Sequence, residues 1–156
     1  MLVLLLLLSF VALLQGLSIS PNVKVIEKAN GNGIEEFDVN HPEAVLLKPL
    51  VRELPGKSFE LKYELGARKA GDSVVFHETS PKVVFHMPSN PQVQMVCPSP
   101  DIDEVTFLRI TTYQNSRKGD AYVSNGGIGR KHILFTVNAY GTKNWQWEIE
   151  IYARRT

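Results

Sequence analysis

Apolar and polar residues alternate along much of this chain, in short segments that are separated by turn-forming residues. The clearest segment covers residues 145–151, where two tryptophans and two isoleucines share one face and glutamine and glutamate share the other. A period of two predicts a β-strand with one buried face. Shifting its register by one residue would bury Glu148 and Glu150, so the pairing of this strand is strongly specified.

The same alternation predicts several more strands toward the N-terminus. They are expected over residues 59–65, 73–78, 82–87, 92–96, 104–113, 121–123 and 131–140. The tetrapeptide Val-Val-Phe-His occurs twice, in matched strands around residues 79–81, which predicts a hairpin. Short strands with regular turns favour an antiparallel arrangement. The sequence therefore predicts an all-β domain over residues 59–156, an antiparallel β-sandwich or a barrel-like fold.

Residues 19–58 have a different composition, with glycine, asparagine, acidic residues and prolines scattered among apolar ones. The stretch 43–54 has helix-like apolar positions, but Pro49 would break or kink a helix there. We expect residues 19–58 to form an irregular, partly ordered N-terminal arm. It either packs on the domain or is removed as a pro-segment.

Residues 1–18 are almost entirely apolar and contain no charged side chain. An apolar run that ends in small residues, here Gly16 and Ser18, is typical of a secretory signal peptide. A membrane anchor is the alternative, but the run is short for a span of about 20 residues and no basic cluster follows it. We therefore expect a secreted, extracellular protein with no stable membrane insertion after signal removal.

Charge and cysteine content narrow the range of partners. The chain has 17 Lys and Arg against 16 Asp and Glu, a formal net charge of +1. Binding to nucleic acid usually requires clustered excess base, so no nucleic-acid partner is expected. Cys97 is the single cysteine, so no internal disulfide can form. It is either a free structural thiol or the site of an intermolecular disulfide that links a dimer.

Three segments carry a resemblance to a known family. They contribute Gly66, Arg68, Gly71 and Asp72, then Gly126, Gly127 and Gly129, and finally Tyr152. With these motifs, residues 63–152 resemble the insect multiprotein-bridging-factor type-two family, named for a transcription activator. Its members include small secreted proteins of salivary glands or venom. The resemblance implies structural roles for the motif residues; where the family has glycine after Ile-Tyr, this chain has Ala153.

The glycine-rich run at residues 125–129 is followed by Arg130 and Lys131, which suggests a phosphate-binding loop. Such loops normally lead into a helix, whose N-terminus supplies positive potential. Here an alternating strand pattern follows instead. We therefore predict a turn between two strands, with glycines at positive φ and basic residues at its end.

The two histidines of the repeated tetrapeptide, His77 and His86, would approach each other in a hairpin and could hold zinc. A zinc site needs a third or fourth ligand. Glu78, His132 and Cys97 are the candidates, and no characteristic spacing links them. Ordinary histidines on a sheet surface are the preferred interpretation, and no metal site is predicted.

No motif in the chain indicates catalysis. The sequence has neither a nucleophile elbow nor a His-Glu-x-x-His motif. Glu148 and Glu150 resemble a carboxylate pair but fit the polar face of the last strand. Trp145 and Trp147 could line a ligand cleft, yet the isoleucines that continue their stripe indicate core. We predict no catalytic residue, no cofactor and no enzymatic activity.

These observations lead to one main expectation and two alternatives. The main expectation is a secreted, non-enzymatic binding or effector protein of the salivary or venom type, as the resemblance implies. Its partner would be an extracellular protein or a small ligand. The first alternative is a protein-interaction module in transcriptional co-activation, as the family name suggests. The second alternative is a small secreted hydrolase.

Overall fold

Ten β-strands make up the secondary structure of the computed structural model, which describes residues 44–98 and 101–156. The strands are β1 (Val45–Leu47), β2 (Leu50–Leu54), β3 (Ser58–Gly66), β4 (Ser73–Thr79), β5 (Val83–Ser89), β6 (Gln92–Pro98), β7 (Ile102–Gln114), β8 (Gly119–Gly126), β9 (His132–Ala139) and β10 (Thr142–Arg155). In this part of the chain, no helix has the length and apolar character needed to cross a membrane.

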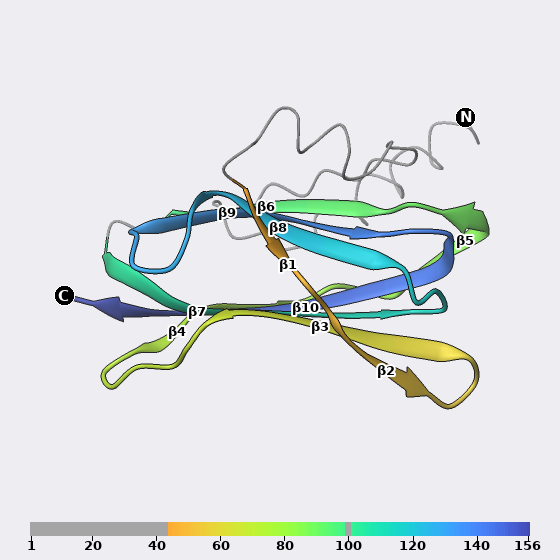
Figure 1. Ribbon diagram of the computed structural model, residues 1–156, viewed down its shortest axis with the longest axis horizontal. Coiled ribbons are helices and arrows are strands. Elements are labelled where there is room, and N and C mark those ends of the chain that lie inside the picture. Colours follow the sequence, from red (N-terminus) through yellow and green to blue (C-terminus); the bar gives the residue numbers. More distant parts are fainter. Residues whose placement is uncertain (1–43, 99–100) are drawn as a thin grey trace, which may run out of the picture.

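The strands form two antiparallel sheets that lie face to face (Figure 1). The smaller sheet has the order β1-β8-β9-β6. The larger sheet has the order β2-β3-β7-β10-β4, and β5 also pairs with β10. This arrangement confirms the predicted all-β antiparallel fold. The two sheets remain separate, so the architecture is the sandwich and not a closed barrel.

Strand β10 follows the pattern that its sequence predicts. Trp145, Trp147, Ile149 and Ile151 are all buried, while Glu148 faces outward. Burying a large apolar side chain contributes roughly 1.5–3 kcal/mol each, so this stripe is a major source of stability. The tryptophans therefore belong to the core, as predicted, and do not line a ligand cleft.

The core fills the space between the two sheets with side chains from both. Tyr63 and Leu108 contribute from the larger sheet, and Phe135 and Val93 from the smaller one, all with no exposed surface. Each of these residues belongs to the buried cluster of the core. The outward side of the larger sheet is left free to carry polar groups.

Strands β4 and β5 do not form the hairpin predicted from their matched sequences. Both pair with β10 instead, β4 with residues 148–153 and β5 with residues 142–145. The reason lies at Ser80, whose N–H donates to the Trp147 carbonyl at 2.8 Å. The Trp147 N–H in turn donates to the Ser80 hydroxyl at 3.0 Å. These bonds carry the chain along β10 where a turn was expected.

The segment 19–58, expected as a partly ordered arm, contributes two strands to the domain. Strand β1 pairs with β8 in the smaller sheet, and β2 pairs with β3 in the larger one. Pro49 lies between them, where the chain crosses from one layer to the other as a diagonal (Figure 1). Residues 1–43, including the predicted signal peptide, lie outside the described residues.

Candidate functional site

The first motif segment forms the connection between β3 and β4, and Asp72 holds it in place. Arg68 Nε donates to Asp72 Oδ1 at 2.8 Å, and the Lys69 N–H donates to Oδ2 at 2.7 Å. The hydroxyl of Thr106, on β7, also donates to Oδ2 at 2.8 Å. These hydrogen bonds, led by the one from Arg68, hold the pKa of the Asp72 carboxyl well below its usual range. Asp72 thereby fastens the connection to the larger sheet.

Arg68 also lies against the third motif. Its guanidinium carbon is 3.7 Å from the centroid of the Tyr152 ring. The Tyr152 and Phe107 ring centroids are 5.9 Å apart, and the Arg109 guanidinium carbon is 5.2 Å from the Phe107 centroid. Guanidinium groups are attracted to the faces of aromatic rings. Arg68, Tyr152, Phe107 and Arg109 therefore form a continuous row, which we call the arginine–aromatic row.

The second motif segment joins the two sheets at the same end of the sandwich. The Gly129 N–H donates to the Val105 carbonyl at 2.8 Å, and the Val105 N–H donates to the Arg130 carbonyl at 2.7 Å. Gly126, Gly127 and Gly129 have φ values of 67°, 118° and 79°, which confirms the predicted glycine turn with positive φ. This turn belongs to the smaller sheet, yet it is hydrogen-bonded to β7 of the larger one.

Gly66 shows why the first and second motifs must pack closely. Its φ is +79°, and a Cβ at this position would overlap the carbonyl oxygen of Thr106. The same Cβ would lie 2.7 Å from Cδ1 of Ile128, in the glycine turn. Glycine is therefore required both by conformation and by space. All three motif segments meet around residues 105–107 of β7.

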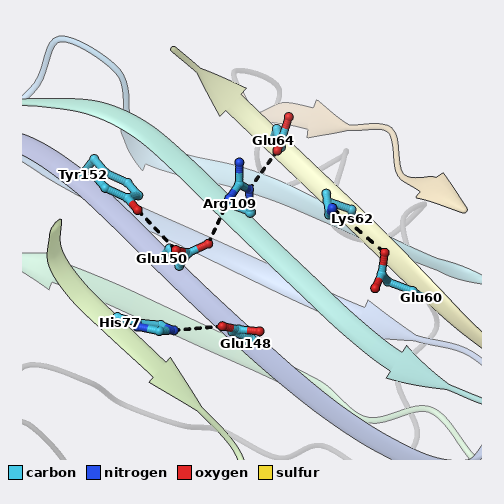
Figure 2. A network of polar contacts seen from close by, with 8 residues as sticks. All are labelled: Glu60, Lys62, Glu64, His77, Arg109, Glu148, Glu150 and Tyr152. Atoms are coloured by element: carbon cyan, nitrogen blue, oxygen red, sulfur yellow. Dashed lines mark hydrogen bonds and ion pairs between the residues drawn. The ribbon is translucent and has the colours of Figure 1, made fainter. Parts of the chain in front are cut away.

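Charged side chains extend from this point across the outward side of the larger sheet, which we call the outer face. Figure 2 shows Arg109 between two glutamates on neighbouring strands. Its Nε donates to Glu64 Oε1 at 2.9 Å, and its Nη1 donates to Glu150 Oε2 at 3.3 Å. The Tyr152 hydroxyl donates to Glu150 Oε1 at 3.3 Å. Arg109 thus connects β3, β7 and β10 through their side chains.

Further pairs continue the pattern toward both edges of the sheet. His77 Nε2 lies 2.8 Å from Glu148 Oε1 (Figure 2). Glu60 accepts from Arg52 at 2.9 Å and lies 4.0 Å from Lys62 Nζ. Acidic and basic groups therefore alternate over the outer face. A fixed pattern of this kind selects partners whose charges are complementary to it.

The network orders the outer face more than it stabilises the fold. The side chains of Arg109 and Glu64 are 38% and 46% exposed, and exposed ion pairs contribute about 0–1 kcal/mol. The hydrogen bond that Arg109 donates to Glu64 raises the pKa of Arg109, so this guanidinium stays charged. The main effect of the network is to hold the charged groups of the outer face at defined positions.

An open, mostly polar depression lies at the same end of the sandwich, between Gly71, Gly129 and the end of β10. Arg154 pairs there with Glu104, and Lys69 Nζ lies 3.5 Å from the same carboxylate. The hydrogen bond from Arg154 lowers the pKa of Glu104. These groups are engaged with one another, so we place the candidate site on the outer face.

The histidines considered for metal binding are not brought together. His77 pairs with its outer-face glutamate, and His86 is exposed on β5. The third, His132, lies 2.9 Å from the side-chain oxygen of Asn125. Among the described residues, no group of three His, Cys, Asp or Glu side chains is arranged to hold a metal.

Cys97 lies in β6 with its side chain half-buried, opposite Ile133 of β9, and its thiol is free. Burial raises the pKa of this thiol. Because the thiolate is the reactive form, Cys97 is a poor nucleophile near neutral pH. Its surroundings are those of a structural thiol.

Sequence reasoning missed several residues of the site, chiefly Phe107, Arg109 and Thr106. One signal was available, because alternation over β7 places Phe107 and Arg109 opposite the buried Leu108 and Ile110. Their meeting with Arg68 and Tyr152 depends on the pairing of distant strands. That pairing leaves no local mark in the sequence.

The comparison with protein families decides the identity of the domain. The family model described as "Transcription activator MBF2" matches residues 65–153, more than half of the 156-residue chain. The chain belongs to the MBF2 family. No curated protein and no solved structure gives a significant match. The MBF2 match spans the end of β3 to the end of β10, so it contains all eight motif residues and the arginine–aromatic row.

MBF2 membership confirms the resemblance to the family. It also corrects the function that we expected from the predicted signal peptide. Membership of a transcription activator family contradicts the main expectation, a secreted effector of the salivary or venom type. It favours the first alternative, a protein-interaction module in transcriptional co-activation. The expected secretion, and the expected extracellular partner with no nucleic acid, are wrong for the same reason. Those expectations depended on residues 1–18, an apolar run without a charged side chain that lies outside the described residues.

Proposed function

We propose that this MBF2 family member is a protein-interaction module in transcriptional co-activation, which acts by binding and not by catalysis. The observation that carries the proposal is the family match over residues 65–153. The matched range includes the motif residues, the arginine–aromatic row and the outer-face groups of β4, β7 and β10. Glu64 and the other outer-face charges of β2 and β3 lie before it. That the chain comes from an insect stays a prediction of the resemblance.

The outer face supports a role in recognition. Its charged groups lie on adjacent strands of a rigid sheet, and Arg109 is held from two sides by Glu64 and Glu150. Charges fixed before binding lose little conformational freedom when a partner arrives. Because several glutamates lie on this face, we propose that the partner bound there is a protein, namely a transcription factor.

A reporter-gene assay tests the proposal with the full-length chain. The chain is co-expressed with a sequence-specific transcription factor and its reporter, and transcript levels are measured. We expect an increase over the factor alone. Arg109→Glu would place three acidic groups together and is expected to remove the increase, while Lys143→Glu reverses an exposed charge at the start of β10 and is expected to preserve it. No increase with the wild-type chain would contradict the proposal.

The location of the chain provides an independent test. Nuclear extracts and culture medium of producing cells are compared by immunoblot, and the chain in each is analysed by intact mass and N-terminal sequencing. We expect the chain in the nuclear fraction with its N-terminal residues retained. A chain found only in the medium, and lacking residues 1–18, would contradict a role in transcription.

A further inference from the structure

Strands β4 and β5 together form one long edge of the larger sheet. Strand β10 pairs with β7 along one side, over residues 145–155, so β4 and β5 both occupy its other side. Both run antiparallel to β10 and therefore run in the same direction, one after the other. Ser80, bonded to Trp147, lies where they meet.

This edge exposes apolar side chains and backbone hydrogen-bonding groups. Val74 is 49% exposed, Val84 73% and Met87 74%. Strand β5 pairs with β10 only at residues 83, 84 and 89, with an irregularity between them. Exposed edges with apolar side chains are templates for pairing with another strand. Strand β4 contains neither a lysine nor a proline; Pro81 and Lys82 lie between β4 and β5, and Pro88 lies near the end of β5.

The repeated tetrapeptide gives the edge a symmetry of its own. One copy of Val-Val-Phe-His begins at Val74 and the other ends at His86, at equal distances from Ser80. We propose that two copies of this chain pair antiparallel along this edge, about a two-fold axis at Ser80. The tetrapeptides then face each other as Val74 with His86, Val75 with Phe85, Phe76 with Val84 and His77 with Val83 of the second copy.

Charge supports the same register. With Ser80 at the axis, Glu78 faces Lys82 of the second copy, and the symmetry repeats this pair. Opposite charges at directly facing positions stabilise antiparallel pairing, and like charges oppose it. A two-fold interface needs a surface that is complementary to itself. Both the apolar tetrapeptides and the charges meet this requirement in one register, which favours a second copy over an unrelated peptide.

Sedimentation equilibrium of the full-length chain in reducing buffer, over a range of concentrations, tests the proposal. We expect a reversible shift from one chain to two. Glu78→Lys or Lys82→Glu alone places like charges at two symmetry-related positions, and each is expected to raise the dissociation constant roughly tenfold. The double variant, Glu78→Lys with Lys82→Glu, is expected to restore the wild-type constant. Circular dichroism checks that each variant is folded.

The matched control is Leu50→Lys, which adds a charge at a residue that is 71% exposed on β2, the opposite edge of the same sheet. It is expected to leave the dissociation constant unchanged. A monomer at every concentration up to about 1 mM would overturn the proposal, since that limit excludes all but negligible affinity. A dimer that responds to Leu50→Lys, or to neither charge reversal, would also overturn it. The proposal would also be overturned if this edge bound an extended peptide from another protein and no second copy of the chain.

Discussion

The guanidinium carbon of Arg68 lies 3.7 Å from the centroid of the Tyr152 ring, although the two residues come from near opposite ends of the β domain. Arg68 is at the same time held by Asp72, 2.7 Å from its Nη2. One arginine therefore joins the connection after β3 to the last strand. The contact makes the first and third motifs of the family a single structural unit.

Replacing Tyr152 with leucine tests the contribution of this contact. The variant loses the ring face that attracts Arg68, and we expect the free energy of unfolding to fall by about 0.5–1 kcal/mol. Tyr152→Phe is the control, because it keeps the ring and removes only the hydroxyl that donates to Glu150. Urea denaturation compares the two. A larger loss in the phenylalanine variant would assign the stability to the hydroxyl instead.

Asp72 is expected to make stability depend on pH in the acid range. Its pKa in the folded chain is depressed, first by the hydrogen bond from Arg68, below the unfolded value of about 3.9. The stabilisation is therefore fully present above that value and is lost as pH falls through the folded pKa. Asp72→Asn is expected to be less stable at pH 7, with the difference shrinking below about pH 4.

Urea denaturation at a series of pH values measures this effect. Asp101→Asn is the matched control, since it changes an exposed carboxyl in the same way. Curves for wild type and Asp72→Asn that stay parallel down to the acid limit would show that the depressed pKa does not contribute to folding.

Alanine substitutions at Gly66 and Gly71 distinguish the cost of an unfavourable backbone conformation from the cost of a packing overlap. Both have a φ of +79°, but a Cβ on Gly71 would meet no atom within 4 Å. Gly71→Ala is expected to cost about 1–2 kcal/mol for its left-handed conformation alone. Gly66→Ala should cost clearly more, because its Cβ must displace the Thr106 carbonyl as well. Thermal and chemical unfolding measure both losses. If Gly66→Ala and Gly71→Ala lost the same free energy of unfolding, β3 would have to be able to move away from β7.

Trp147 is expected to be among the most costly positions to truncate. It is 6% exposed and lies in the core between the sheets, so Trp147→Ala should lower the free energy of unfolding by about 3–5 kcal/mol. Glu148→Ala changes its outward-facing neighbour, whose partial exposure limits the expected loss to about 1 kcal/mol. Similar losses in the two variants, measured by urea denaturation, would contradict the assignment of Trp147 to the core.

Local alternation was sufficient to predict β3 to β10, but not β1 and β2, which lie in the segment expected as an irregular arm. Strand β10 and the glycine turn near Gly127 have the burial and the backbone angles that their sequences indicate. The reason is that side-chain period and the need for positive φ are properties of a few neighbouring residues. An antiparallel sandwich follows from many such strands without knowledge of their order.

Pairing order and the site could not be obtained in the same way. The two Val-Val-Phe-His segments suggested a hairpin, but the hydrogen bonds between Ser80 and Trp147 direct both to β10. Arg109 was missed because its role depends on Glu64 and Glu150, which belong to other strands. Long-range pairing determines such contacts, and the local pattern is compatible with several pairings.

The position of β10 also affects when the domain can fold during synthesis. It is the last of the strands that the structure describes, and β4, β5 and β7 all pair with it. Until the ribosome has released it, β4 and β5 lack their partner and Val84 and Met87 remain on unpaired segments. Completion of the larger sheet must therefore wait until β10 has left the ribosome. Sheets closed by such distant pairings form slowly, and unpaired apolar segments of this kind are prone to aggregation during that interval.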